Sequence, residues 1–273
     1  MLIAQLSDLH IKVGGKLAYG VVDTAGMLRT CVADLQSLNP QPDVLVLTGD
    51  LVDYGTAQEY DFLKEVLAPI QLPMYLLAGN HDERQGLRQA FAGPGFEYLN
   101  ACGEFLQYAV DLGGLRLIAM DTVVPGEGRG ALCTQRLQWL EERLSENDMP
   151  TVIAMHHPPF ETGIAHMDAI GLEGADALET IVARHPHVER LICGHLHRPI
   201  QVCFGNTLAS TCPSPAHQVA LDLRDNGPDC FVMEPPGYQL HLWRKGRLIS
   251  HTRSVGDFGG SHRFRVGGVL IDE

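Results

Sequence analysis

The sequence predicts an α/β fold with a central, largely buried sheet, and two observations support this prediction. Apolar runs of strand length recur along the chain, and segments with helical periodicity lie between most of them. The strand-like runs are almost continuously apolar, as is typical of strands that are covered on both faces. With 273 residues, 45% of them hydrophobic, the chain can bury a large core as one domain, or as one domain with an accessory segment.

The expected elements follow one another up to about residue 200. Strands are predicted at residues 2–6, 43–48, 74–78, 115–120, 151–155 and 190–193. Helical periodicity covers residues 24–38, a segment that begins at Thr56, a segment that follows Thr134, and residues 174–184. The start of the second helix is the best defined, because Thr56-Ala-Gln-Glu59 has the pattern of a capping box.

The character of the sequence changes after Pro199. Short strand-like segments at residues 239–243 and 248–252 are separated by turns rich in proline and glycine, and no clear helix pattern interrupts them. We therefore expect residues 1–200 to form the core, with a soft boundary to residues 201–273. The second segment is expected to complete the core with strands, and to cap a site or to make a subunit contact.

The charge of the chain limits its partners. The formal net charge is -13, and the sequence contains no basic run that would follow a nucleic-acid backbone or bind an anionic membrane surface. No segment approaches the ~20 apolar residues of a membrane span. We therefore expect neither a nucleic-acid polymer nor a membrane as a partner.

The N-terminus and the cysteines point to a cytoplasmic protein. The apolar residues 1–6 lack a basic leader and are too few for a signal peptide, so we interpret them as the first strand. The seven cysteines are odd in number, are scattered, and include no C-x-x-C pair. We expect reduced and mostly buried thiols.

Polar clusters directly follow five of the predicted strands. The clusters are Asp8-Leu-His10, Gly49-Asp50, Gly79-Asn80-His81-Asp82, His156-His157 and Gly194-His195-Leu-His197. In an open α/β sheet, the loops at the carboxyl ends of neighbouring strands converge on one crevice, where ligands bind. Residues far apart in the sequence are therefore expected to form a single site.

This mixture of carboxylates, imidazoles and an amide suits divalent first-row metals such as Mn, Fe, Co or Zn. The clusters hold more ligands than one ion needs, and a carboxylate can bridge two ions. Two metal ions about 3.5–4 Å apart are a recognised arrangement for phosphoester cleavage. The spacings D-x-H and H-x-H fit this arrangement, because alternate residues of an extended backbone point the same way.

The five motifs resemble, in order and loop context, the signature of calcineurin-like metallophosphoesterases. They run from residue 8 to residue 197, which is most of the chain. The resemblance implies a four-layer αββα sandwich with a small β-rich C-terminal elaboration that acts as a cap or in oligomerisation. It also implies that residues 1–200 are the catalytic core and that the protein is a homo-oligomer, a dimer or larger.

The resemblance assigns a role to each motif residue. One metal ion would be bound by Asp8, His10 and His197, the other by Asn80, His156 and His195, with Asp50 as the bridge. His81 would contact the phosphoryl oxygen or protonate the leaving alkoxide, and Asn80 and His195 would also contact the substrate. Two cations would lower the pKa of a shared water to near neutrality, so that hydroxide acts as the nucleophile.

Other interpretations of these residues have to be considered. Asp8 and Asp50 taken singly could be turn formers. Asp82 could orient His81 or the metal ligands, but we favour a role as the cap of a following helix. His157 is expected either to support the site from behind or simply to be packed. The remaining histidines without a motif are expected to be ordinary ones, namely His166, His185, His187, His241, His251 and His262.

The second motif bears on the substrate. Its continuation reads Gly49-Asp-Leu-Val-Asp53-Tyr54-Gly55. The related Ser/Thr protein phosphatases have at the position of Tyr54 an arginine that grips a dianionic monoester, and purple acid phosphatases have a tyrosine ligand at the position of Asp53. Without the bidentate arginine, a phosphodiester with a single charge is the better substrate.

The overall resemblance is to the branch of class III cyclic-nucleotide phosphodiesterases and glycerophosphodiesterases. This branch shares G-N-H-D, the motif H-H-P-P at residues 156–159 and a C-terminal cap. Within it, Tyr19 and His217 are candidate substrate contacts, while a buried tyrosine and a turn histidine are the alternatives. A monoesterase, a nuclease or a non-catalytic scaffold with the same fold are the other functions to be weighed.

Overall fold

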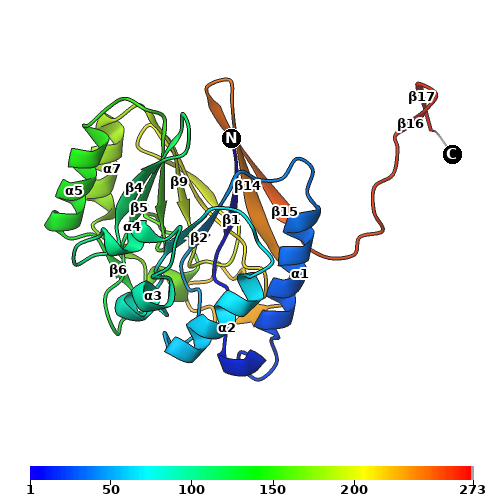
Figure 1. Cartoon of the computed structure of the whole chain (residues 1–273), viewed down its shortest axis with the longest axis horizontal. Coiled ribbons are helices and arrows are strands. Elements are labelled where there is room, and N and C mark those ends of the chain that lie inside the picture. The colour runs from blue at the N-terminus through cyan, green and yellow to red at the C-terminus, as the bar shows by residue number, and fades with distance from the viewer. Residues whose placement is uncertain (272–273) are drawn as a thin grey trace.

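Two β-sheets packed face to face form the centre of the computed structural model, which describes residues 1–271 (Figure 1). The first sheet has the order β15-β14-β1-β2-β3, and the second has the order β10-β11-β9-β7-β5-β4. In the first sheet the bounds are β1 Leu2–Leu6, β2 Val44–Thr48, β3 Met74–Leu77, β14 Gly237–Arg244 and β15 Arg247–Ser254. In the second they are β4 Tyr108–Asp111, β5 Arg116–Met120, β7 Thr151–Met155, β9 Val188–Cys193, β10 Gln201–Phe204 and β11 Thr207–Thr211.

Helices cover the outer face of each sheet. The longer ones are α1 Thr24–Ser37, α2 Ala57–Leu67, α5 Thr134–Leu144 and α7 Ala175–Arg184. Apolar residues of α1 and α2 belong to one core with the first sheet, and those of α5 and α7 form a second core with the second sheet. Figure 1 shows α1 beside β14 and β15, and α5 and α7 on the opposite side of the molecule. The four-layer αββα arrangement is therefore confirmed.

The alternation of side chains along β7 explains why the strands are apolar throughout. Val152 and Ala154 belong to the core shared with the first sheet, whereas Ile153 and Met155 belong to the core with α5 and α7. Successive residues of a strand point to opposite faces, so a strand between a sheet and a helical layer needs apolar residues at every position. The apolar pattern alone, however, suggested one central sheet, because it does not reveal which strands pair.

The helix starts follow local side-chain chemistry. The capping box of α2 is confirmed, since Thr56 Oγ1 accepts a hydrogen bond from Glu59 N and the Glu59 carboxylate accepts one from Thr56 N. Glu59 also accepts a hydrogen bond of 3.0 Å from Tyr54 N. The same carboxylate thereby fixes the end of the loop that follows β2 and contains Asp50.

Short elements complete the fold, and of these the sequence predicted only a helix after Asp82, which is α3. They are η1 Val13–Gly15, α3 Arg84–Ala90, α4 Glu97–Asn100, α6 Ala165–Asp168, β6 Gly130–Ala131, β8 Leu172–Glu173, β12 Gln218–Val219, β13 Phe231–Val232, β16 Arg265–Val266 and β17 Val269–Leu270. None of the described helices is both long enough and apolar enough to cross a bilayer.

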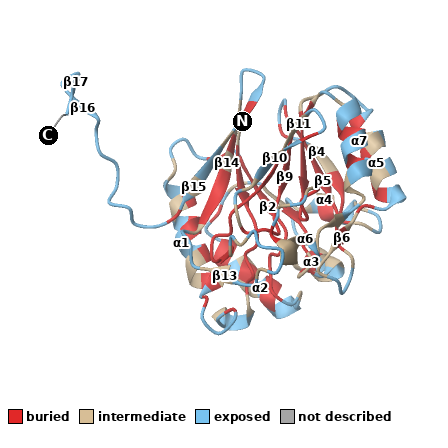
Figure 2. Ribbon diagram, turned by 180° about the vertical axis from the view of Figure 1, so that it is seen from behind, coloured by how far each residue is buried: buried red, intermediate tan, exposed pale blue. Residues whose placement is uncertain are grey.

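Residues after Pro199 contribute to both sheets and then leave the body. They supply β10 and β11 to the second sheet, and β14 and β15 to the first. From residue 256 onward the chain runs away from the body as an exposed arm that carries the β16–β17 hairpin (Figures 1 and 2). The domain boundary near residue 200 stays a prediction.

All seven cysteines are free, but the expectation that they are mostly buried is wrong. Three are buried, at positions 31, 193 and 212, and three are exposed, at positions 133, 203 and 230. The exposed thiols lie in short segments and turns, where the sequence pattern does not indicate burial.

Candidate metal centre

The carboxyl ends of strands from both sheets meet at one edge of the sandwich. β1, β2 and β3 are parallel to one another, as are β5, β7, β9 and β11. Backbone hydrogen bonds join neighbouring loops, from His10 N to Asp50 O at 3.0 Å and from Gly194 N to His156 O at 2.9 Å. The Asp8 carboxylate accepts a hydrogen bond from His195 N at 2.9 Å and so joins a loop of the first sheet to one of the second. The five polar motifs therefore lie in one place, as predicted.

The backbone of these loops has an unusual conformation. Positive φ angles occur at residues that are neither glycine nor exposed turn residues, namely Asp8 (58°), His10 (45°), Asp50 (49°), His195 (70°) and His197 (52°). Such conformations are sparsely populated for residues with a Cβ and cost about 1–3 kcal/mol each. Their concentration here indicates that the loops are shaped to aim side chains, rather than to make the most stable turns.

Two motif glycines allow the loops to approach one another. At Gly49, with φ +93°, an added Cβ would lie 2.5 Å from His156 Nδ1. At Gly79 it would overlap the Asp50 carboxylate. These glycines are therefore required by close packing of the polar side chains, in addition to the turn itself.

The first predicted ligand set is gathered in the structure. Asp8, His10 and His197 each offer one ligand atom, and these three atoms lie within 4.8 Å of one another. His10 Nε2 lies 3.2 Å from His197 Nε2, and His197 Nε2 lies 3.6 Å from Asp8 Oδ1. All three side chains are almost completely buried.

The second predicted set lies next to the first, with Asp50 between them. His156 Nε2 is 3.0 Å from Asn80 Oδ1 and 3.3 Å from Asp50 Oδ2. The same oxygen, Asp50 Oδ2, is 3.7 Å from His10 Nε2. Asp50 therefore occupies the position between the two sets that a bridging ligand would need.

Hydrogen bonds to carbonyl groups fix how the histidines face the centre. Because a carbonyl oxygen can only accept, His156 Nδ1 donates to Thr48 O at 2.8 Å and His197 Nδ1 donates to His217 O at 3.0 Å. In the neutral His197 ring, Nε2 then carries a lone pair that faces the Asp8 carboxylate. Buried acceptors without donors between them are unfavourable, and a cation among them removes this cost.

His195 provides a second indication of a cation site. Its Nε2 is buried and has no hydrogen-bond partner among the described residues. Burial, together with the neighbouring His157 and His156, lowers the pKa of His195 well below the usual value, so its ring is neutral and its nitrogen is free to bind a metal. Burial likewise lowers the pKa of His197 to about 3.

His156 and Asp50 behave as an ion pair before any cation binds. Burial alone would lower the pKa of His156, but the Asp50 charge outweighs burial and raises the pKa to about 9. Burial would raise the pKa of Asp50, but His156 holds it well below the usual value. Hence a proton occupies this ligand set in the metal-free chain, and a metal ion would have to displace it.

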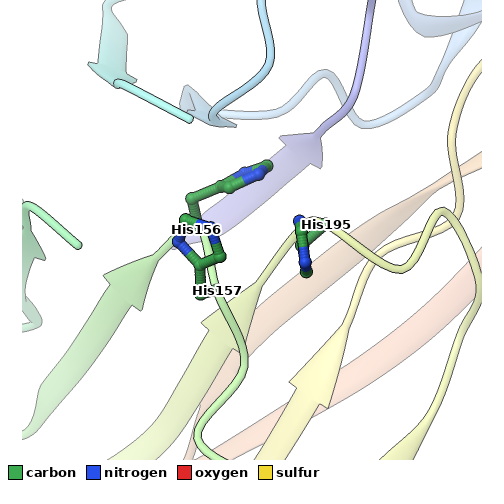
Figure 3. A group of neighbouring side chains, drawn as sticks. All are labelled: His156, His157 and His195. Carbon is green, nitrogen blue, oxygen red and sulfur yellow. The ribbon is translucent and has the colours of Figure 1, made fainter. Parts of the chain in front are cut away.

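His157 lies near the centre but is not free to bind an ion. Figure 3 shows His156 and His157 on consecutive residues and His195 on the neighbouring strand end, and the three form a group of possible ligands by distance alone. However, His157 Nε2 donates to Gly128 O at 3.0 Å, and its Nδ1 accepts from Thr122 Oγ1 at 2.8 Å. Both ring nitrogens are used, which matches the expectation of a packed, supporting histidine.

The expected role of Asp82 as a helix cap is wrong. Glu83 caps α3, accepting hydrogen bonds from Gln85 N and Gly86 N. The buried Asp82 carboxylate instead accepts hydrogen bonds from the backbone N–H groups of Leu51 and Gly79, at 3.1 and 2.9 Å, and from Tyr60 Oη at 3.1 Å. Asp82 therefore acts as a brace that ties the loop after β2 to the loop after β3. The sequence pattern could not distinguish this role from that of a helix cap.

A cavity of about 530 Å³ opens above the centre. The predicted residues that line it are His10, Tyr19, Asp50, Asn80, His81, His195, His197 and His217. Asp8 and His156 do not line the cavity and lie fully buried. Both ligand sets therefore have members that a substrate in the cavity can reach.

Tyr19 and His217 form part of an aromatic wall of the cavity. Tyr19 is 59% exposed, so the alternative of a buried tyrosine is wrong. Its ring stacks on Phe231 at a centroid distance of 5.0 Å, and His217 packs edge-on against Tyr19 at 5.3 Å. His217 Nδ1 is buried and lacks a partner among the described residues.

The sequence missed several other residues of the cavity wall. His166, expected to be an ordinary histidine, lines the cavity together with Met167, Ile170, Asp229 and Phe231. His166 Nε2 lies 3.5 Å from Asp229 Oδ1, so α6 and the segment before β13 meet there. No motif or periodic pattern surrounds these residues, and their proximity depends on loop packing alone.

The other motif-free histidines lie outside this site. His185 pairs with Glu141 at 3.1 Å, and the buried His241 is hydrogen-bonded to Ser250 and Gln5. His187 lies beside Asp148, while His251 and His262 are exposed. None of these five lines the cavity.

Comparisons with known proteins agree with this geometry. The family model of the calcineurin-like phosphoesterases matches residues 1–199. The chain belongs to the calcineurin-like phosphoesterase family. This family depends on two metal ions, and the His/Asp clusters described above are able to bind metal.

Individual relatives place the chain more closely within the family. It is 38% identical to a protein named "Probable glycerophosphodiester phosphodiesterase GpdQ" from Arcobacter nitrofigilis, over 100% of both chains. It is 30% identical to the "3',5'-cyclic adenosine monophosphate phosphodiesterase CpdA" of Pseudomonas aeruginosa, over 94% of this chain and 91% of that protein. A dimetal phosphatase from Danio rerio shares the fold with a TM-score of 0.69 at 14% identity, over 94% of this chain and 97% of that one.

The brace formed by Asp82 can be tested by the substitution Asp82→Ala. It leaves two backbone N–H groups and the Tyr60 hydroxyl without their acceptor, so we expect a loss of about 3 kcal/mol in the free energy of unfolding. Urea denaturation of the metal-free protein measures this loss.

Glu83→Ala is the matched control, because it removes the helix cap at the next residue and should cost about 1 kcal/mol. A loss for Asp82→Ala no larger than that of the control would contradict the brace.

Proposed function

We propose that this chain hydrolyses small phosphodiesters, either 3',5'-cyclic nucleotides or glycerophosphodiesters, with the help of two metal ions. The main support is the position of Asp50 Oδ2, which lies 3.3 Å from His156 Nε2 and 3.7 Å from His10 Nε2 and so can serve both ligand sets. The names of the relatives, a glycerophosphodiester phosphodiesterase and a cyclic AMP phosphodiesterase, support the substrate class.

The proposed ligands of the first ion are Asp8, His10 and His197, and those of the second are Asn80, His156 and His195. Asp50 would bridge the two ions. Oxygen and imidazole ligands of this kind suit Fe, Mn, Zn or Co. When bound, the ions supply a nucleophile from water at neutral pH and stabilise the charge on phosphorus in the transition state.

His81 is the proposed proton donor to the leaving oxygen. It lines the cavity, its backbone N–H donates to Asp50 Oδ1 at 2.9 Å, and its Nδ1 donates to Asp53 O at 2.9 Å. These two bonds fix the ring and leave Nε2 as the nitrogen that can face a substrate. Asn80, His195, Tyr19 and His217 are proposed as further substrate contacts because they line the same cavity.

The charge of the cavity favours a diester over a monoester. None of the described residues that line it is lysine or arginine, and Asp229 adds a carboxylate to its wall. Tyr54, at the position where Ser/Thr phosphatases have arginine, is 71% exposed and does not line the cavity. Apart from the proposed ligand Asp50, a dianionic monoester would therefore meet the repulsive Asp229 carboxylate and no lysine or arginine.

The alternatives are a monoesterase or nuclease of the same family, or a non-catalytic scaffold. The net charge of -13 counts against long nucleic acids. A scaffold does not need a full set of ligands, whereas all seven proposed ligands gather here. A cytoplasmic location stays a prediction from the sequence.

The substrate proposal is tested with matched aryl phosphates. After reconstitution with Mn²⁺, we expect a higher kcat/KM for a bis(aryl) phosphate diester than for the corresponding aryl monoester. The reason is that no lysine or arginine among the described residues lines the cavity to bind the second negative charge of a monoester. A panel of cyclic nucleotides and glycerophosphodiesters then ranks the natural classes. Preference for the monoester would refute the diester proposal, and absence of metal-dependent turnover would favour the scaffold.

The role of His81 is tested by His81→Ala. We expect the variant to keep its metal content while kcat falls by about 10²–10⁴-fold, as is typical when a general acid is lost. Metal analysis and steady-state kinetics measure the two effects.

Asp50→Ala is the contrasting variant, because both ions lose a ligand and both metal content and activity should fall. If His81→Ala also lost its metal ions, His81 would be a ligand and the assignment would be wrong.

We further propose that the chain forms a homo-oligomer, a dimer or larger, through its C-terminal arm, residues 256–271. Apolar side chains of the arm are exposed, among them Phe264 and Val269, although an isolated soluble domain normally buries such residues. Light scattering should show that Phe264→Ser/Val269→Ser is smaller than the wild type, while Val21→Ser, at another exposed valine, is not. An unchanged mass would exclude the arm as the contact.

A further inference from the structure

Lys12 lies beside the centre but does not face the cavity. Its ammonium group forms an ion pair with Asp53 and lies 4.3 Å from the centre of the Tyr54 ring. Lys12 is 15% exposed and the Asp53 side chain is 10% exposed, so the pair is largely removed from solvent. Neither Lys12 nor Tyr54 lines the cavity, so this cation is not placed to touch a substrate.

Asp53 divides its two carboxylate oxygens between Lys12 and a proposed metal ligand. One oxygen, Oδ2, pairs with Lys12 Nζ, and the other, Oδ1, lies 3.3 Å from His10 Nδ1. A carboxylate that accepts from one ring nitrogen of a metal-binding histidine fixes the ring and directs the other nitrogen at the ion. Asp53 O also accepts from His81 Nδ1 at 2.9 Å, so the same residue contacts the proposed proton donor.

The backbone around the pair is held in place independently of the side chains. Ile11 and Val52 form a parallel bridge, and Asp53 N donates to Ile11 O at 3.2 Å. Lys12 and Asp53 therefore start from fixed positions, unlike a surface ion pair between two flexible side chains.

Lys12 is also the only lysine or arginine among the described residues that pairs with a carboxylate of this centre. The other ion pairs of Asp8, Asp50 and Asp53 are to histidines. Without Lys12, Asp53 Oδ2 would lose its charged partner in a largely buried position, which favours rotation of the carboxylate toward solvent and away from His10.

We infer that Lys12 is a positioning residue of the metal centre, which holds the Asp53 carboxylate against His10 and so sets the direction in which His10 Nε2 faces the ion. The inference rests on the proposed two-metal site and adds to it a residue outside the five motif clusters. The Tyr54 ring also contacts the ammonium group, and this cation–π contact helps to hold Lys12 in place.

Binding of Mn²⁺ alone to the full chain tests this role. By equilibrium dialysis, we expect Lys12→Met to bind one of two Mn²⁺ ions about 10–100-fold more weakly, the usual effect of losing a partner behind a metal ligand. The electron paramagnetic resonance spectrum of bound Mn²⁺ should change with it. Lys12→Arg, which keeps the charge, should recover most of the affinity, and Lys16→Met, at an exposed lysine of the same loop, should match the wild type.

A double variant tests whether Lys12 acts through Asp53. Asp53→Asn should weaken the same ion, and adding Lys12→Met should cause little further loss, because the partner of Lys12 is already changed. Should Lys12→Met fail to fold, as judged by urea denaturation of the metal-free chain, Lys12→Gln replaces it in the same measurements.

Three outcomes would overturn the inference. They are wild-type Mn²⁺ binding by the folded uncharged variant, additive losses in the double variant, or a higher KM with unchanged metal affinity, which would make Lys12 a substrate contact. A wild-type chain that binds no Mn²⁺ would instead refute the two-metal proposal, so the two failures can be told apart.

Discussion

The contact between the Asp8 carboxylate and the backbone of His195 is the constraint on which the site depends. Asp8 follows a strand of the first sheet and His195 follows a strand of the second. The Asp8 carboxylate accepts from His195 N with both oxygens, at 2.9 and 3.1 Å. Gly194 makes this approach possible, since an added Cβ would overlap the Ser7 hydroxyl. Unless the two sheets meet in this way, ligands from residues 8–82 and from residues 156–197 cannot surround the same point.

This arrangement has a cost that only function explains. The buried carboxylates of Asp8 and Asp50 lie among histidines, the Asp82 carboxylate is buried close by, and several ligand residues have strained backbone conformations. Burial raises the pKa of Asp8 to about 6, offset in part by His156, and burial also raises the pKa of Asp82 to about 6, with Asp50 adding to the rise. A fold selected for stability alone would replace such a cluster with apolar residues. Such a cluster is expected at a site whose partner carries positive charge.

The features that the sequence predicted well depend on local patterns with strict geometry. The positions of most strands, the capping box at Thr56 and the meeting of five motifs at one edge follow from apolar runs, turn chemistry and the topology of parallel strands. The strands β4, β10 and β11 of the second sheet were not predicted. Interactions between loops were not predictable. Asp82 matched a helix cap, and only the folded loops reveal that it braces the N–H groups of Leu51 and Gly79. His166 and Asp229 meet through loop packing that no periodicity describes.

The distribution of positive charge connects the site with its substrate. Lys12, a cation within a few residues of the proposed ligands, is directed away from the cavity and pairs with Asp53 beneath the Tyr54 ring. The described residues that line the cavity therefore leave its positive charge to bound metal ions. A substrate with a single negative charge needs fewer cations beside the metal ions than a substrate with two. The same lysine that orders the ligands is thus withheld from the substrate, and both effects favour a phosphodiester.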